Sequence, residues 1–285
     1  MNSNNLAQYL LNEGEIALSR MGPLLAGIRG KEARLPVLAL RQGNVTSEQL
    51  EGLDTSAEDA FVREAEEKGM LTQAQIDYLR QGKFGETVRF AQCLLDAGLA
   101  DYAKLEAWFR DCDALEEMPV HRAVMALCGD FLSREAGRYS EFMEIFMDSL
   151  MEFLHTPSVI SLESDAGEAL SGKEKVYAVS QRMAGGIDMV TGILAAEREF
   201  LELARRYSQE DLEEVDDLAI DSVAEFVNVV NGIFSVQLAE RKIEVDLEPP
   251  RWGMQVEPRG GSQLLMRLVT DLGDIYAVLA RDEFM

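Results

Sequence analysis

The segment that begins at Asp221, DSVAEFVNVVNG, places polar side chains along one line of an otherwise apolar helix. Asp221, Glu225 and Asn228 recur at spacings of four and three. At 100° per residue they share a stripe about 80° wide with Gly232 and Ser235. A carboxylate can pair with a cation, and a carboxamide can both donate and accept a hydrogen bond. The line is compatible with an ordinary solvated face, or with an edge that binds a partner.

The opposite side of the same helix, expected over 217–238, is apolar. Val227, Val230 and Phe234 face away from the polar line, so this side is expected to be buried. Gly232 is a poor helix former and costs about 1 kcal/mol relative to alanine. Its missing side chain would let another surface approach the helix closely.

The elements around this helix predict an α+β domain over 137–285, in which helices pack on an antiparallel sheet. A polar loop is expected after the first helix, and Gly185-Gly186 is the turn signal of a β-hairpin. The expected helices are 140–154, 197–207 and 217–238. The expected strands are VYAVSQRMA and IDMVTGILA on either side of the glycine pair, then 243–247, 253–257, 263–271 and 274–281.

The first half repeats a helix–glycine–helix unit four times, which predicts an all-α domain over 1–110. The glycines are expected at helix C-termini, and they are Gly14, Gly43, Gly69 and Gly98. Thr46, Thr72 and Asp101 are expected to start the helices that follow. The units resemble the small helical repeat in N-terminal regions of type II secretion and pilus assembly ATPases. This indicates a docking platform or oligomerisation element, joined by a helical connector at 111–136 to the second domain.

The composition of the 285 residues narrows the class of partner. The net charge is −24, of which residues 1–135 carry −8 and residues 136–285 carry −16. A field of that sign repels nucleic acid and anionic lipid, and it favours a protein partner with an exposed lysine or arginine. No signal peptide and no run of about 18 apolar residues is recognised, so a cytoplasmic protein without a membrane span is expected.

The three cysteines indicate reduced thiols and no metal site. Cys93, Cys112 and Cys128 form no CxxC pair and are odd in number, which argues against a disulfide framework. Cys112, Cys128 and His121 lack the spacing of metal ligands.

The second half, about 137–285, resembles the CheC/CheX/FliY family of chemotaxis phosphatases. The family signature is Asp or Ser, three residues, Glu, two residues, Asn, and a proline about twenty residues later. The matching positions are Asp221, Glu225, Asn228, Gly232 and, 21 and 22 residues past the asparagine, Pro249 and Pro250. The first helix of the domain offers Glu141 and Glu144 without a matching asparagine, so one site is expected, as in CheX.

The resemblance implies hydrolysis of the aspartyl phosphate on a CheY-like receiver domain. The receiver would supply Mg²⁺ and a lysine, so this chain needs no cofactor of its own. Asn228 would orient the attacking water and Glu225 would meet the receiver's lysine. Asp221 would support the edge or cap the helix, and Gly232 would admit the partner. A homodimer through sheet edges, as in CheX, is compatible with the sequence.

Two other classes of function compete with this interpretation. In the first, the CheX-like domain is a catalytically silent adaptor that docks a receiver or another signalling protein, with the helical units as scaffold. The second is a metal- or nucleotide-dependent enzyme, for which no P-loop, HExxH or glycine-rich phosphate loop is found.

Overall fold

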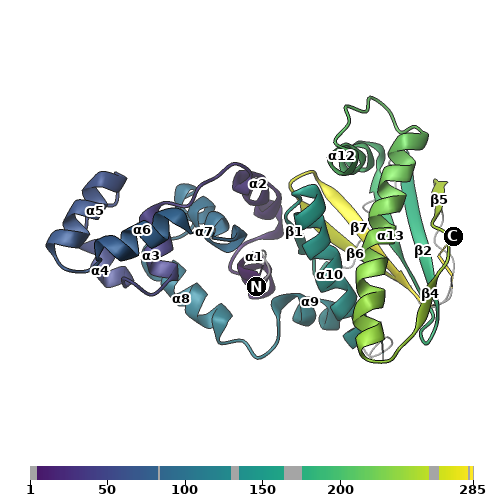
Figure 1. Ribbon diagram of the computed structural model, residues 1–285, viewed down its shortest axis with the longest axis horizontal. Helices are drawn as coiled ribbons and strands as arrows, with labels where there is room; N and C mark the ends of the chain where they lie inside the picture. The colour runs from purple at the N-terminus through teal and green to yellow at the C-terminus, as the bar shows by residue number, and fades with distance from the viewer. Residues whose placement is uncertain are drawn as a thin grey trace. The chain divides into compact units, whose positions relative to one another are not determined.

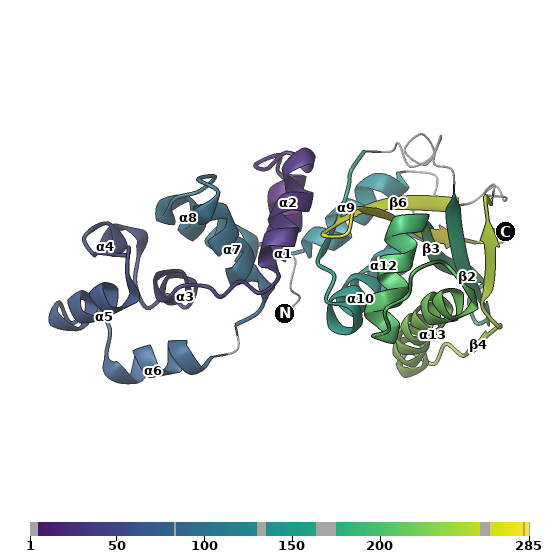
Figure 2. The same ribbon diagram turned by 90° about the horizontal axis from the view of Figure 1, so that it is seen from above.

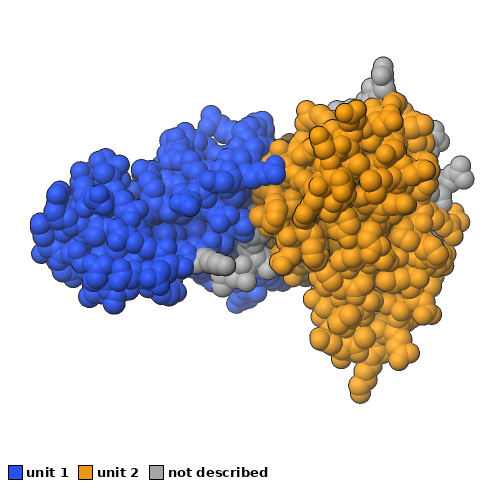
Figure 3. All heavy atoms as spheres, turned by 45° about the horizontal axis from the view of Figure 1, so that its top comes forward, with its two compact units in different colours: residues 1–119 blue, residues 120–285 orange. Residues whose placement is uncertain are grey.

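The chain forms two compact units, residues 1–119 and 120–285 (Figure 3). The computed structural model describes residues 5–82, 84–129, 135–163, 175–256, 263–281 and 283–284.

In the part of unit 1 that the structure describes, all the secondary structure is helical (Figure 1). Its core includes the buried side chains of Leu10, Leu25, Phe61, Leu94 and Leu105. Its helices are α1 (Asn5–Asn12), α2 (Leu18–Ile28), α3 (Leu35–Arg41), α4 (Ser47–Glu51), α5 (Glu58–Glu67), α6 (Gln73–Gln81), α7 (Glu86–Asp96) and α8 (Tyr102–Asp113).

The turns inside the helical pairs of unit 1 are built by glycines in the left-handed conformation. At Gly43 φ is 68°, its N–H donates to the carbonyl of Leu40, and the N–H of Asn44 donates to that of Ala39. This is the Schellman pattern, which satisfies carbonyls at a helix C-terminus. The same geometry follows α1, α5 and α7, at Gly14, Gly69 and Gly98.

The helices after three of these turns begin with the expected caps. The Thr46 and Thr72 hydroxyls accept from backbone N–H groups, and both residues form capping boxes with the glutamine three positions later. Asp101 accepts from the N–H of Lys104. A local sequence signal therefore sets where each of these helices starts.

Unit 2 combines helices with a seven-stranded antiparallel sheet. The strand order is β1-β6-β7-β3-β2-β4, and β5 also pairs with β2. The helices are α9 (Pro119–Cys128), α10 (Ala136–Leu154), α12 (Glu197–Ser208) and α13 (Asp217–Glu240). The strands are β1 (Ser158–Ile160), β2 (Val176–Gly185), β3 (Met189–Ala196), β4 (Val245–Leu247), β5 (Arg251–Met254), β6 (Gln263–Thr270) and β7 (Asp274–Ala280).

Helix α9 lies within the stretch 111–136 that the sequence assigns to a connector. Val120, Val124 and Cys128 of this helix are buried in the core of unit 2. Residues 130–134 of the same stretch lie outside the described residues.

The β-hairpin of β2 and β3 is present, but its turn differs from the expected two-residue turn. The strands pair from Val176↔Ala196 to Met183↔Met189, so the turn runs from Ala184 to Asp188. Ala184 and Gly185 extend β2 beyond the hairpin and pair with β4. Gly185, which the sequence assigns to the turn, therefore belongs to β2 and pairs with β4.

Strand β1 corrects the expectation of a polar loop after the first helix. It pairs with the end of β6 through Ser158↔Thr270 and Ile160↔Leu268. A run of three residues is too short to show the alternation that marks a strand. Residues 164–174 of the expected loop lie outside the described residues.

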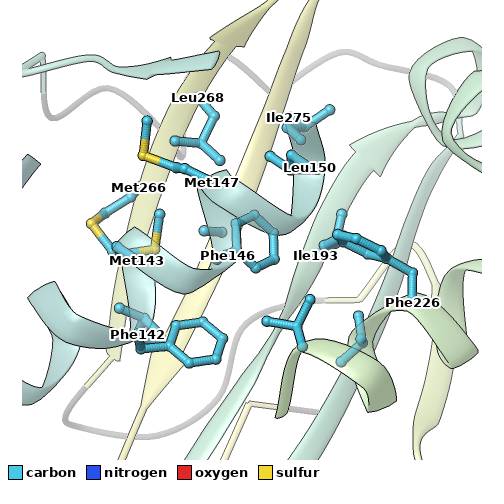
Figure 4. Close-up of a cluster of buried hydrophobic side chains, with 14 of the residues drawn as sticks. Phe142, Met143, Phe146, Met147, Leu150, Ile193, Phe226, Met266, Leu268 and Ile275 are labelled. Carbon is cyan, nitrogen blue, oxygen red and sulfur yellow. The ribbon is translucent and has the colours of Figure 1, made fainter. Parts of the chain in front are cut away.

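Helices α10, α12 and α13 cover one face of the sheet (Figure 2). Phe142 of α10 packs edge-to-face on Phe234 of α13 with ring centroids 5.5 Å apart. Figure 4 shows Phe146 and Leu150 of α10 in the same buried cluster as Ile193 of β3. Helix α13 is thereby held against the sheet, and its other side, which carries Asp221 and Glu225, is exposed.

Helix α13 is long and apolar enough to cross a membrane by length and composition alone, although it contains no unbroken apolar run of that length. Half of the most apolar stretch is buried inside the structure. Its hydropathy is accounted for by its place in the core of unit 2.

Candidate functional site

Helix α13 and the chain that follows β4 border a groove of about 510 Å³ on unit 2. The helix contributes the three polar side chains of the predicted line. The lining residues are Asp221, Glu225 and Asn228, with Ile220 and Ala224, from α13, Gln181 from β2, Leu247 at the end of β4, and Glu248, Pro249, Pro250, Arg251 and Trp252 beyond it. The fold thus brings the predicted acid, amide and prolines to one place.

The polar line is exposed because the opposite side of α13 packs into the core. Asp221 and Glu225 are exposed and Asn228 is half-buried, whereas Val227 and Phe234 are buried. This is the orientation that the helical periodicity predicts.

Asp216, rather than Asp221, caps α13. Its carboxylate accepts from the N–H of Ala219 at 2.9 Å. Asp217 adds a second carboxylate to the first turn, where negative charge is favourable. Asp221 is therefore not the cap of α13, and of its two expected roles only support of the groove edge is left.

Asn228 is held by two hydrogen bonds in definite directions. Its Oδ1 accepts from Gln181 Nε2 at 2.8 Å, and its Nδ2 faces Glu225 Oε2 at 3.4 Å. The second N–H of Asn228 has no acceptor within the described parts of the chain. It is therefore free to donate to a molecule in the groove.

Glu225 presents a carboxylate at the surface beside Asn228. Burial, and then the charge of Glu225, raise the pKa of Tyr207, whose ring lies edge-to-face on Phe226. The phenol of Tyr207 therefore stays neutral at pH 7. Glu225 is exposed and forms no ion pair within the described residues, so its carboxylate is available to a cation from outside.

Gly232 continues the line one turn beyond Asn228, outside the residues that border the groove. A Cβ built on Gly232 would meet no atom within 4 Å. The glycine is therefore not required by packing within the described structure.

The structure adds residues to the site that the sequence analysis missed, above all Gln181, Asn231 and Thr191. Gln181 is 2% exposed, and Asn231 and Thr191 are fully buried. One signal was available: Val179, Gln181 and Met183 alternate on one face of β2, so a glutamine at an inward position of a strand marks a buried polar contact.

Helix α10 carries no second line of this kind. Glu141 forms an ion pair with Arg241 at 2.7 Å, and Glu144 is half-buried, which raises its pKa. No three His, Cys, Asp or Glu side chains in the described ranges are placed to hold a metal ion.

No family model and no curated protein matches the sequence. Solved structures match about half of the chain. Unit 2 is similar to CheX, CheC-like and FliY proteins. CheX from Vibrio vulnificus matches at 20% identity and a TM-score of 0.41, over 49% of this chain and 92% of that protein. A CheX–CheY complex with BeF3 and Mg²⁺ from Borrelia burgdorferi matches at 18% and 0.38, over 51% and 97%. FliY from Thermotoga maritima matches at 14% and 0.36, over 49% and 84%. CheX, CheC-like and FliY proteins are of the family that the sequence resembles.

Proposed function

We propose that unit 2 hydrolyses the aspartyl phosphate of a CheY-like receiver domain. The observation that carries the proposal is the pair formed by Glu225 and Asn228, whose side chains lie 3.4 Å apart at a groove that the described residues of unit 2 leave open. Their order and spacing are those of the signature that the sequence resembles. A CheX–CheY complex is among the structures similar to unit 2.

The chemistry asked of this chain is positioning. An acyl phosphate is already activated, and the receiver brings its own Mg²⁺ and lysine. What is missing is a water held in line with the phosphorus–oxygen bond that breaks, as a glutamine holds one in GTPases. The Asn228 carboxamide keeps one N–H and one Oδ1 lone pair for this task, because Gln181 and Glu225 occupy the others. An amide is almost non-basic, so it orders the water and does not remove its proton.

Glu225 serves as the anchor of the partner. Its carboxylate stands one turn before Asn228 and would pair with the receiver's active-site lysine. An ion pair of this kind gains strength when docking excludes water. Asp221, one turn further back on the same line, adds a second negative charge to the groove edge.

The proposal is tested by adding the full chain to each receiver domain of its organism, phosphorylated with a small-molecule donor. We expect faster release of inorganic phosphate from one of them, in proportion to the amount of chain added. If every receiver loses phosphate at its own rate while one binds tightly, the chain is an adaptor and the enzymatic proposal is wrong.

Removing the proposed anchor should weaken docking more than chemistry. For Glu225→Ala we expect about tenfold weaker binding to the phosphorylated receiver, corresponding to one desolvated ion pair of about 1.4 kcal/mol. Titration of a fluorescently labelled receiver measures this. Glu240→Ala is the matched control, because it removes the same charge from an exposed position at the end of α13, away from the groove. Equal weakening in both variants would mean that Glu225 contributes only to the overall negative charge and forms no specific ion pair with the receiver.

Substituting alanine for Gly232 should have opposite effects on the stability of unit 2 and on receiver binding. Gly232→Ala should stabilise unit 2 by up to about 1 kcal/mol through helix propensity, since the new Cβ meets no atom within 4 Å. The same methyl group should weaken receiver binding several-fold if the partner approaches there. Thermal unfolding and the receiver titration measure the two effects.

Gly137 in α10 is the matched glycine, since a Cβ there also meets nothing within 4 Å and the residue lies away from the groove. Gly137→Ala should leave receiver binding unchanged. Unchanged binding of Gly232→Ala as well would remove Gly232 from the docking surface.

A further inference from the structure

A chain of buried polar side chains runs beneath the groove and ends at Asn228. Thr191 Oγ1 donates to Asn231 Oδ1 at 2.7 Å, and Asn231 Nδ2 donates to Gln181 Oε1 at 2.8 Å. Gln181 Nε2 then donates to Asn228 Oδ1 and to the Glu248 carbonyl, both at 2.8 Å. The first three side chains are at most 2% exposed, so the chain links the interior of unit 2 to its surface.

Three elements of unit 2 bring these residues together. Gln181 and Thr191 are direct partners in the register of β2 and β3. Helix α13 packs on both strands, and Asn231 lies three residues after Asn228, turned inward where Asn228 is turned outward. Asn231 thus bonds to both members of one cross-strand pair.

The donor and acceptor of each hydrogen bond in this series follow from the contact between Gln181 and the Glu248 carbonyl. The backbone carbonyl of Glu248 can only accept, so the Gln181 atom that faces it must be the amide nitrogen. Gln181 Oε1 must therefore accept from Asn231 Nδ2. Reversing the amide of Asn231 would set two acceptors against each other, so the hydroxyl of Thr191 donates to Asn231 Oδ1.

The same argument fixes Asn228. Because Gln181 Nε2 faces it, Asn228 must turn Oδ1 inward and Nδ2 toward Glu225 and the groove. An asparagine on a free helix surface would reverse its amide readily, and half of its orientations would present the wrong atom.

We propose that Gln181 is a positioning residue that fixes the carboxamide of Asn228, with Asn231 and Thr191 holding Gln181 in turn. The inference rests on the proposed function and deepens it, because a pre-oriented amide orders the attacking water without reorganisation when the receiver docks.

The polar chain is not required to fill the core. Its neighbours facing the helices, Val179, Met183 and Ile193, are apolar and buried. Apolar side chains in place of the polar ones would avoid the cost of burying amides, a cost that is offset only when every member is hydrogen-bonded. Among the described residues, this series of hydrogen bonds reaches the groove at the side chain of Asn228.

Gln181→Met tests the proposal, because methionine has similar length and cannot donate. In the full chain we expect the maximal rate of receiver dephosphorylation to fall about 10- to 100-fold, while the receiver concentration at half-maximal rate changes less than twofold. A nitrogen relaxation measurement on the Asn228 side chain, without receiver, should give a lower order parameter than in the wild type.

Thr191→Val and Thr191→Ser form a milder pair, three hydrogen bonds away from Asn228. The isosteric valine removes the hydroxyl and should lower both the maximal rate and the Asn228 order parameter. Serine keeps the hydroxyl and should restore both. The pair also decides the matter if Gln181→Met does not fold.

The outcomes separate this inference from the proposed function. An active wild type whose maximal rate and Asn228 order parameter survive both Gln181→Met and Thr191→Val overturns the positioning role alone. With an inert wild type the proposed function fails, and the order parameter by itself decides whether Gln181 fixes Asn228.

Discussion

Asn228→Ala is expected to abolish the acceleration of receiver dephosphorylation, with a loss of about 100-fold or more in the maximal rate. The substitution removes the group that holds the attacking water, and misplacement of a reacting group by about 1 Å is enough for a loss of that size. Glu225 and the rest of the groove are untouched, so binding to the phosphorylated receiver should change less than threefold. Phosphate release under receiver saturation measures the first effect, and titration measures the second.

The same variant has a small predicted cost in stability. Gln181 Nε2 would lose its partner on Asn228 and keep the Glu248 carbonyl, so the free energy of unfolding should fall by no more than about 1.5 kcal/mol. Gln237→Ala is the matched control, because it truncates an exposed amide on the same helix away from the groove. It should retain the full rate.

Asn228→Asp sharpens the test. Aspartate keeps the shape of the side chain and the hydrogen bond from Gln181, but it has no N–H to offer and adds a charge that repels phosphate. We expect it to be as inactive as the alanine variant. A catalytically active aspartate variant would contradict the assignment of Asn228 as the residue that orders the water.

The orientation of α13 was predictable from the sequence because it depends on periodicity within one helix. Residues at spacings of three and four share a face whatever packs on the other side, so Glu225 and Asn228 had to project together. Likewise the caps at Thr46 and Thr72 depend on neighbours only three positions away. Features that depend on residues within a single helix, such as its exposed face and its cap, can therefore be predicted from the sequence.

The support beneath Asn228 could not be predicted, because it depends on how separate elements align. Gln181 lies 47 residues before Asn228, and their contact requires the register of β2 and β3 and the placement of α13. A shift of one residue in that register would turn Gln181 to the other face of the sheet. Strand β1 could not be predicted for the same reason, because it is defined by its pairing with β6.

An ion pair between distant parts of unit 2 is another feature that depends on how separate elements align, and it could not be predicted from the sequence either. Arg206 of α12 donates to both carboxylate oxygens of Asp271, at 3.1 and 2.9 Å, across 65 residues. The two side chains are 8% and 3% exposed. Arg206 also donates to Thr156 at 2.8 Å and contacts the carbonyl of His155, where α10 ends. One guanidinium therefore connects α12, the turn after β6 and the end of α10.

Arg206→Met is expected to lower the free energy of unfolding of unit 2 by about 3–5 kcal/mol, because it leaves the buried carboxylate of Asp271 without its cation. At about 2–4 °C per kcal/mol for a unit of this size, the melting temperature should fall by about 10 °C. Adding Asp271→Asn should recover part of the loss by removing the uncompensated charge. Arg241→Met is the control, since its pair with Glu141 is 56% and 38% exposed and should cost less than about 1 kcal/mol. Equal losses in the two single variants, measured by thermal and urea unfolding, would mean that burial of the Arg206–Asp271 pair does not decide the stability of the fold that presents Asn228.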